Sequence, residues 1–366
     1  MDITYKCFKC ETKAPVSTKQ ASCNCGGLWT LDFEPPKFSL DLVDKKNWGV
    51  FRYRAFLPLQ NEDWREITLG EGMTPVINFD DNVMLKMDYF MPTLSFKDRG
   101  AAVLIAHCKT IGVNAVVQDS SGNAGNSVAA YCSKAGIECD IYVPEGTSPA
   151  KINMIESHKA TVHVVPGSRD NCANVCRSQV AEQGKYYANH VYNPFFYEGT
   201  KTYIYEVYEQ TGRIPENIFL PLGNGTLFIG VVKGLEELLH SGIISKMPQI
   251  YAIQSEHCAP FVKAHNAGER LPAKIQPKPT YAEGIAIGVP KRGEEILEYI
   301  YKYDIKTITA PESRILEARA LLAAKGIYCE HTTAASYAAY LAYCEKFGTV
   351  KDSLIPMCGA GLKSDH

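Results

Sequence analysis

The amino-acid sequence predicts an α/β fold with two domains, each built on a parallel-type sheet flanked by helices. Apolar, β-branched runs recur from about residue 115 to the C-terminus, and helical patterns lie between most of them. Strands that alternate with helices form parallel sheets with helices on both faces. Small-residue turns follow two of the runs, and ligands bind at such ends of parallel strands. The length of 366 residues exceeds what one typical hydrophobic core supports, which favours two domains.

The individual elements follow from this alternation. The strands are expected at 115–119, 140–144, 161–165, 186–190, 217–222, 249–255, 306–310 and 354–358. The helices are expected at 100–108, 125–135, 169–183, 226–239, 311–324 and 333–347. Residues 31–71 are polar and aromatic with several prolines, and we expect wrapping segments with little chemistry there.

Composition excludes several classes of function. Hydrophobic residues make up 46% and charged residues 21% of the chain, which is typical of a globular protein. A net charge of −2 gives no electrostatic basis for binding nucleic acid or an anionic membrane. Because no apolar run reaches the length of a bilayer span and the N-terminus lacks a signal-peptide pattern, we expect a cytoplasmic protein.

Four of the 13 cysteines lie close together in the N-terminal segment 1–35. Cys7 and Cys10 form a C-x-x-C pair, and Cys23 and Cys25 form a C-x-C pair that two glycines follow. Two turns that each offer two thiolates are the plan of a zinc ribbon, so structural zinc is one expectation. The second pair is one residue shorter than usual, and four free thiols in a metal-free knuckle are the alternative.

Lys97 follows an extended apolar run and precedes the helical pattern 100–108. A cation at the start of a helix faces the positive end of the helix dipole, which is unfavourable. A carbonyl cofactor would explain the placement, because a Schiff-base lysine must lose its proton and the helix dipole lowers its pKa. A solvated surface lysine in a turn is the alternative.

Two turns rich in small residues have the strand, turn and helix arrangement of an anion site. The first contains Ser120, Ser121, Gly122 and Asn123, and the second contains Gly223, Asn224, Gly225 and Thr226. Glycine lets the backbone approach an anion, and the N–H groups that open the helix then bind it. Neither turn matches a Walker loop or a dinucleotide fingerprint. With Lys97 they suit an amino-acid carboxylate and a cofactor phosphate.

Several motifs resemble those of the fold type II pyridoxal-phosphate enzymes, and threonine synthases most closely. They comprise Gly70-Glu71-Gly72-Met73-Thr74-Pro75, Pro92-Thr93 with Ser95-Phe96-Lys97-Asp98-Arg99-Gly100, Ser121-Gly122-Asn123, Asn193-Pro194 with Glu198-Gly199 and Lys201-Thr202, Gly223-Asn224-Gly225, and Gly359 with Gly361-Leu362-Lys363. They run in the family's order over most of the chain. Threonine synthases often carry a small N-terminal ribbon, which adds to the case for zinc.

The resemblance implies a role for each motif. Lys97 would bind pyridoxal 5'-phosphate covalently and act as the catalytic acid and base, and Asn123 would lie beside the phenolic oxygen of the cofactor. The cofactor phosphate would be bound by Gly223, Asn224, Gly225 and Thr226. The substrate carboxylate would be bound by Ser120, Ser121 and Gly122. Cys358 stands where threonine synthases have a threonine that faces the pyridine nitrogen. A buried thiol without that role is the alternative for Cys358.

The same resemblance implies the domain layout and the partners. A large cofactor-binding domain would comprise 36–80 and 190–366, a small substrate-side domain would comprise 81–189, and the cofactor would lie in the cleft between them. The expected partner is a small amino-acid substrate. The oligomeric state is open, with a homodimer as one option.

Three positions depart from the threonine synthase pattern and leave the substrate open. Phe196 occupies the position of an arginine that binds the substrate phosphate, which argues for a less charged substrate group. Leu94 replaces a glycine, so we expect a differently built turn there. Glu283 with Gly284 is similar to the Asp-Gly pair of serine and threonine ammonia-lyases, which adds Glu283 to the candidate substrate-binding residues.

Three functions are therefore compatible with the sequence. The first is a threonine synthase-like lyase that catalyses elimination or replacement on a small amino acid, with O-phospho-L-homoserine as one candidate. The second is a serine/threonine ammonia-lyase or a β-replacement synthase of the cysteate or cysteine synthase type. The third is a catalytically silent protein that binds an amino acid, and Lys97 counts against it because a silent protein has no need of this lysine.

Overall fold

The computed structural model describes residues 3–167 and 169–363, and the chain divides into two compact units. Unit 1 comprises Met1–Met73 and Lys97–Thr200, and unit 2 comprises Thr74–Phe96 and Lys201–His366. The predicted domains 1–35, 36–80 plus 190–366, and 81–189 have other boundaries. The difference arises because residues before Met73 pack within unit 1, where the short helix α1 (Trp64–Ile67) contacts helices α2 and α3. The predicted boundaries of the functional domains remain a prediction.

Unit 1 begins with a small antiparallel sheet that holds the cysteine-rich segment. Its strands are β1 (Thr4–Cys7), β2 (Lys13–Pro15) and β3 (Trp29–Asp32), in the order β2-β1-β3. Tyr5 of β1 is 2% exposed and stacks on Trp29 at a centroid distance of 5.8 Å. Its hydroxyl lies 3.3 Å from the Tyr186 hydroxyl of the larger sheet of unit 1. Burial of this aromatic cluster holds the ribbon on the rest of unit 1.

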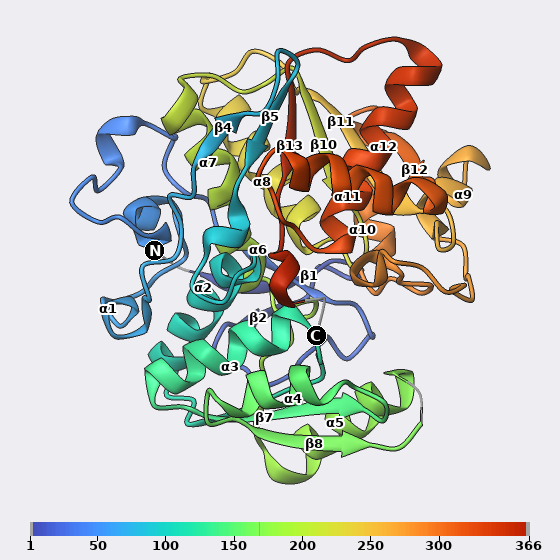
Figure 1. Cartoon of the computed structure of the whole chain (residues 1–366). Helices are drawn as coiled ribbons and strands as arrows, with labels where there is room; N and C mark the ends of the chain where they lie inside the picture. Colours follow the sequence, from blue (N-terminus) through green and yellow to red (C-terminus); the bar gives the residue numbers. More distant parts are fainter. Residues whose placement is uncertain (1–2, 168, 364–366) are drawn as a thin grey trace. The chain divides into compact units, whose positions relative to one another are not determined.

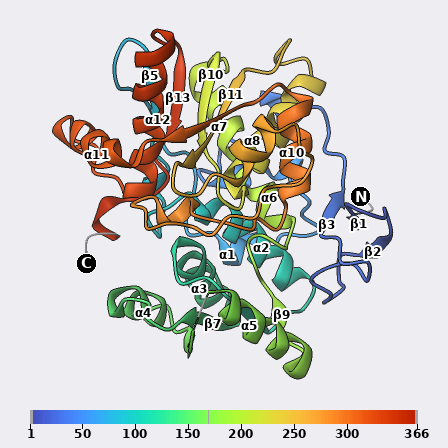
Figure 2. The same cartoon turned by 90° about the vertical axis from the view of Figure 1, so that its right-hand side faces the viewer.

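The larger sheet of unit 1 is fully parallel, with the order β8-β7-β6-β9. Its strands are β6 (Ala115–Gln118), β7 (Glu138–Pro144), β8 (Thr161–Val165) and β9 (Tyr186–Tyr187). Besides α1, the α-helices of the unit are α2 (Lys97–Thr110), α3 (Asn123–Ala135), α4 (Pro149–Glu156), α5 (Arg169–Gln183) and α6 (Phe195–Thr200). Figures 1 and 2 show α3 and α5 beside the strands, and both helices contact β7.

Alternate residues of these strands enter different hydrophobic clusters, as the period of two requires. Val116 and Ile141 are buried with residues of α2 and α3. Val117 and Tyr142 are buried with Cys172 of α5. The sheet is therefore covered by helices on both of its faces, which confirms the predicted architecture for this unit.

Unit 2 contains a six-stranded sheet with the order β12-β11-β10-β13-β5-β4. Its strands are β4 (Val76–Asn78), β5 (Val83–Lys86), β10 (Asn217–Pro221), β11 (Gln249–Ser255), β12 (Lys306–Ala310) and β13 (Ser353–Pro356). All neighbouring strands are parallel except β4, which pairs antiparallel with β5 at one edge. The helices are α7 (Thr202–Thr211), α8 (Thr226–His240), α9 (Pro260–Asn266), α10 (Gly293–Lys302), α11 (Ile315–Ala324) and α12 (His331–Phe347).

Aromatic packing fixes helix α12 on this sheet. Phe219 of β10 stacks on Tyr251 of β11 at 4.2 Å and meets the ring of Tyr340 of α12 edge-on at 5.1 Å. Helix α11 packs alongside α12, as Figure 1 shows in red and orange. Among the described residues, no helix is both long enough and apolar enough to cross a bilayer.

Candidate functional site

Lys97 is the first residue of helix α2, as the sequence predicts. The preceding residues belong to unit 2 and run beside the segment after β13. The Phe96 N–H donates to the Cys358 carbonyl at 2.9 Å, and Ser95 forms an antiparallel bridge with Gly359. Covalent continuity then keeps the Cα atoms of Phe96 and Lys97 about 3.8 Å apart. The candidate Schiff-base lysine therefore directly follows a residue that pairs with Cys358.

Leu94 adopts the backbone conformation that a glycine would favour. Its φ is +60°, in the left-handed region where a Cβ atom costs roughly 1–2 kcal/mol. Its carbonyl accepts from the Ala360 N–H at 3.1 Å. A leucine therefore stands where the threonine synthase pattern has a glycine, in a conformation that glycine adopts more readily.

Phe196 packs within unit 1 beside Lys97. Its ring is fully buried and its centroid lies 5.8 Å from Lys97 Nζ, while Lys97 itself is half-buried. A Cβ atom added to Gly100 would lie 2.3 Å from the Phe196 ring, and one added to Gly199 would lie 2.0 Å from the Arg99 carbonyl oxygen. Helices α2 and α6 therefore approach each other through these glycines. Phe196 contributes an apolar wall next to the lysine.

The first predicted turn follows β6 at the carboxyl edge of the parallel sheet of unit 1. Helix α3 begins at Asn123, and its N-cap residue Gly122 makes no side-chain cap hydrogen bond. A Cβ atom on Gly125 would lie 1.8 Å from the Ser120 carbonyl oxygen, so only glycine allows the helix to start this close to the turn. The first N–H groups of a helix have no intrahelical acceptor, which makes this turn a suitable carboxylate site.

The second predicted turn follows β10 in unit 2 and opens helix α8. Gly225 has a φ of +82°, and an added Cβ atom would lie 2.5 Å from Ile296 Cδ1. At Gly223 an added Cβ atom would lie 2.9 Å from the Ile285 Cα atom. Gly223 is therefore required because backbone blocks a side chain there, and Gly225 is required for its left-handed conformation. Thr226, the first residue of α8, is 4% exposed. The open N-terminus of α8 suits a phosphate group.

Cys358 and Glu283 lie near this second turn within unit 2. Asn217 and Ile218 of β10 pair in parallel with Ser353 and Leu354 of β13, so the turn after β10 and Cys358 after β13 follow the carboxyl ends of neighbouring strands. Cys358 is 2% exposed. Glu283 begins a short 3-10 helix (Glu283–Ile285) whose Ile285 packs against Gly223. The structure therefore brings three of the predicted site segments to one edge of the six-stranded sheet.

Two buried polar atoms beside the candidate residues have no hydrogen-bond partner within the described part of the chain. They are Ser95 Oγ, two residues before Lys97, and Asn126 Oδ1, in the first turn of α3. Buried polar atoms almost always have a partner, so an unpaired one needs an explanation such as a bound group. Neither residue was predicted to take part in a site. For Ser95 the available signal was its place next to Phe96 and Lys97.

The four predicted zinc ligands converge in unit 1. The sulfur atoms of Cys7, Cys10, Cys23 and Cys25 all lie within 4.8 Å of one another. The Cys7–Cys25 and Cys10–Cys23 sulfur distances are 3.5 and 3.6 Å. A tetrahedral site with zinc–sulfur bonds of about 2.3 Å needs sulfur atoms about 3.8 Å apart, so the cluster can hold a zinc ion.

Glu71 is a buried acid of the Gly70–Pro75 motif to which the sequence analysis assigned no role. Its side chain accepts hydrogen bonds from the Leu69 N–H at 2.8 Å and from the Tyr131 hydroxyl at 3.0 Å. Burial raises the pKa of this carboxyl to about 7, and the nearby Asp98 charge adds to the increase. The carboxyl therefore titrates near neutral pH within unit 1.

This raised pKa predicts a loss of stability with increasing pH. Between the ordinary pKa of 4.5 and about 7 the folded state holds a proton that the unfolded state has released, so the free energy of unfolding falls as pH rises. A change of this size corresponds to about 3 kcal/mol. Urea unfolding from pH 5 to pH 8 should show this decline, and Glu71→Gln should flatten it. Equal slopes in both proteins would contradict the assignment.

The chain is similar to known proteins in sequence and in fold. The family model for pyridoxal-phosphate dependent enzymes matches residues 67–359. The threonine synthase of Methanocaldococcus jannaschii is 31% identical, with 91% of this chain and 85% of that protein covered. The threonine synthase of Mycobacterium leprae is 30% identical, with 86% and 88% covered. The structure of processed threonine deaminase isoform 2 from Solanum lycopersicum has a TM-score of 0.72 at 19% identity, with 92% and 93% of the two chains covered.

Proposed function

The chain belongs to the family of pyridoxal-phosphate dependent enzymes and is a threonine synthase-like lyase, and we propose that it acts on a small amino acid with an uncharged leaving group. The observation that carries this proposal is the fully buried ring of Phe196 beside Lys97 Nζ. An apolar wall in that position gives a phosphate group no charge-assisted contact.

The residues present fit pyridoxal 5'-phosphate. Lys97 would hold it covalently, Asn123 would contact its phenolic oxygen, and the turn from Gly223 to Thr226 would bind its phosphate. The steric requirement for glycine at 223, the left-handed conformation of Gly225 and the open start of α8 support the phosphate role. The unpaired Ser95 Oγ and Asn126 Oδ1 are consistent with a polar ligand near Lys97 and the start of α3. When bound, this cofactor supplies the electron sink for elimination and replacement at amino acids.

The protein's own groups would then move protons and orient the substrate. Lys97 Nζ would take the α-proton and return a proton to the leaving group. The N–H groups from Ser121 to Asn123, with the Ser120 and Ser121 hydroxyls, would bind the substrate carboxylate. Cys358 would face the pyridine nitrogen, and a thiol is a weak donor that leaves this nitrogen largely neutral. This arrangement favours elimination and replacement over reactions that need full delocalisation.

Binding of O-phospho-L-homoserine would need a basic residue to contact its phosphate group. Lys201 is the nearest basic residue in the sequence to the Glu198-Gly199 motif. It is fully buried and bonds Glu237 Oε1 at 2.8 Å, so its charge is already engaged. Phe196→Arg is expected to destabilise unit 1 rather than create an anion site, because the new side chain would have to fit against Gly100.

A substrate screen tests this proposal. The purified enzyme would be assayed with O-phosphohomoserine, O-phosphoserine, serine, threonine and cysteine, following keto acid, phosphate and product amino acid. The kcat/KM for O-phosphohomoserine should be at least roughly tenfold below that of the best uncharged substrate, because one charge-assisted contact contributes about 1.5–3 kcal/mol. Efficient conversion of O-phosphohomoserine to threonine would show that Phe196 does not decide the substrate.

A serine/threonine ammonia-lyase is the second candidate. Glu283 supports it, because its short 3-10 helix packs against Gly223 in unit 2, near the proposed phosphate turn. Release of keto acid and ammonia from serine or threonine, without a requirement for a second substrate, would favour this candidate. A homodimer stays a prediction.

We also propose that the four-cysteine cluster holds one structural zinc ion. Elemental analysis should give about one zinc per chain, the number that a single four-thiolate site holds. Cys23→Ser should lose the metal, whereas Cys344→Ser should retain it because Cys344 lies outside the cluster. Metal-free protein with four readily alkylated thiols in the ribbon would show instead that the knuckle holds four free thiols and no zinc.

A further inference from the structure

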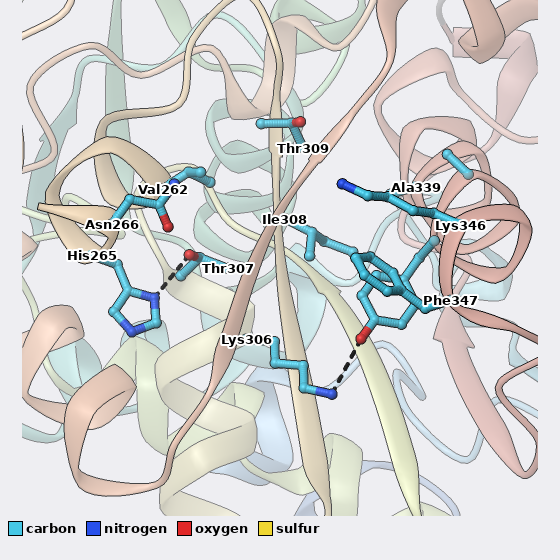
Figure 3. A pocket seen from close by; sticks show the side chains of 12 residues that line it. Val262, His265, Asn266, Lys306, Thr307, Ile308, Thr309, Ala339, Lys346 and Phe347 are labelled. Atoms are coloured by element: carbon cyan, nitrogen blue, oxygen red, sulfur yellow. Dashed lines mark hydrogen bonds between the residues drawn. The ribbon is translucent and has the colours of Figure 1, made fainter.

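A cavity of about 540 Å³ lies along the outer edge of strand β12 in unit 2. Strand β12 is an edge strand of the six-stranded sheet and pairs with β11 on its other side. Figure 3 shows the strand in the middle of the cavity lining, with Val262 and His265 of α9 on one side and Phe347 and Lys346 of α12 on the other. This volume is within the range of small-molecule sites in proteins.

The lining of the cavity combines cations with apolar surface. Lys306 and Lys346 are exposed, and within the described residues no carboxylate lies within ion-pair distance of either. Lys306 Nζ donates to the Tyr343 hydroxyl at 3.2 Å and lies 5.1 Å from the Tyr251 ring centroid. No acidic residue is among the lining residues. The cavity therefore offers two cations without acidic partners.

The apolar part of the lining is contributed by Val262, Ile308 and Phe347. Phe347 is 62% exposed, which is unusual for a large aromatic side chain. Its ring lies 4.6 Å from the Tyr343 ring, so the two aromatic groups form one surface beside Lys306. A ligand that matches this lining carries one negative group and an apolar body.

The cavity is separate from the phosphate turn of the same unit. It lies at β12, whereas the turn follows β10, two places further along the sheet order. Helix α12 extends between the two regions. Thr333 near its start accepts from the Gly359 N–H, next to Cys358, and Tyr343 near its end lines the cavity. Tyr343 follows Thr333 by ten positions on this helix, which corresponds to a rise of about 15 Å.

We propose that this cavity is a second ligand site, which binds a small organic anion through Lys306 and Lys346 and holds its apolar body against Ile308 and Phe347. The ligand class is a carboxylate with an aromatic or branched aliphatic group. The site does not depend on the reaction proposed above, because none of its lining residues belongs to the candidate catalytic residues.

A fluorescence titration of the cofactor-loaded protein tests the proposal. Phe347→Trp places a reporter in the cavity, and the native tryptophans, Trp29, Trp48 and Trp64, all belong to unit 1 and give the background in the unsubstituted chain. The probe is 3-(4-nitrophenyl)propionate, which quenches tryptophan, and its neutral amide is the matched ligand control. Quenching of the fluorescence that the Phe347→Trp substitution adds should saturate with a Kd of about 1 mM or below.

Variants of two lysines locate the binding site. In the reporter protein Lys306→Met should weaken binding roughly tenfold or more, because a charge-assisted contact is lost. Lys325→Met is the control, since Lys325 lies over the Phe79 ring and does not line the cavity. The proposal would be overturned if the neutral amide bound as tightly as the carboxylate probe, or if the Lys306→Met variant bound the probe as tightly as the reporter protein. Quenching that does not saturate would also overturn it. A change of oligomeric state in Lys306→Met with unchanged quenching would instead identify an interface between copies and would also overturn it.

Discussion

Lys97→Ala is expected to lower kcat/KM for the best substrate by on the order of 10³-fold or more, and to abolish the covalent attachment of the cofactor. The magnitude is that of removing a group that forms the covalent link and moves the proton. The visible absorbance band of the lysine-bound cofactor and steady-state kinetics provide the two measurements.

Lys109→Ala is the matched control for this experiment. Lys109 lies on the same helix α2, and its ion pair with Glu66 at 2.6 Å is partly exposed, so its contribution to stability is small. This variant should retain the absorbance band and the activity. Substantial activity of Lys97→Ala with a retained band would contradict the role of Lys97.

Lys86→Met is expected to reduce the free energy of unfolding by about 3–5 kcal/mol. Lys86 and Glu206 form an ion pair at 2.7 Å in unit 2, and both side chains are fully buried. Lys86 Nζ also donates to the Thr74 carbonyl oxygen. Removing the lysine leaves the Glu206 carboxylate buried without its cation, which is far more costly than losing an exposed pair. Urea unfolding at pH 7 measures the change.

The double variant Lys86→Met/Glu206→Met separates the cost of a lone buried charge from the contribution of the pair. Because both charges are then absent, the double variant should be more stable than Lys86→Met. A double variant less stable than the single one would show that the surrounding structure depends on Glu206 itself. A change below about 1 kcal/mol for Lys86→Met would contradict the burial of the pair.

Local patterns were sufficient to predict most of the sheet strands. The runs at 249–255 and 306–310 coincide with β11 and β12 because each is a sustained apolar or β-branched segment. Strand β4 has three residues, Val76–Asn78, and such a short segment carries no clear period. Helix α6 (Phe195–Thr200) contains aromatic residues and Gly199, which are poor helix formers, and it depends on its packing against α2.

The candidate site shows the same division between local and tertiary information. Lys97 at a helix start and the glycine turn before α8 follow from neighbouring residues, so the sequence could predict them. The raised pKa of Glu71 depends on burial, and the hydrogen bond from Tyr131, which lies 60 positions away in the sequence, offsets part of the increase. The unpaired Asn126 Oδ1 likewise depends on packing around α3. These properties arise from contacts between distant segments, which residue patterns do not encode.

The central claim is that Lys97 is the residue that binds pyridoxal 5'-phosphate. Borohydride reduction of the purified protein makes the link between the cofactor and its lysine permanent, and peptide mass spectrometry then identifies the modified residue. The account predicts the added mass on the peptide that contains Lys97, and its absence from that position in Lys97→Ala. Modification of another lysine, such as Lys201 or Lys363, would contradict the account.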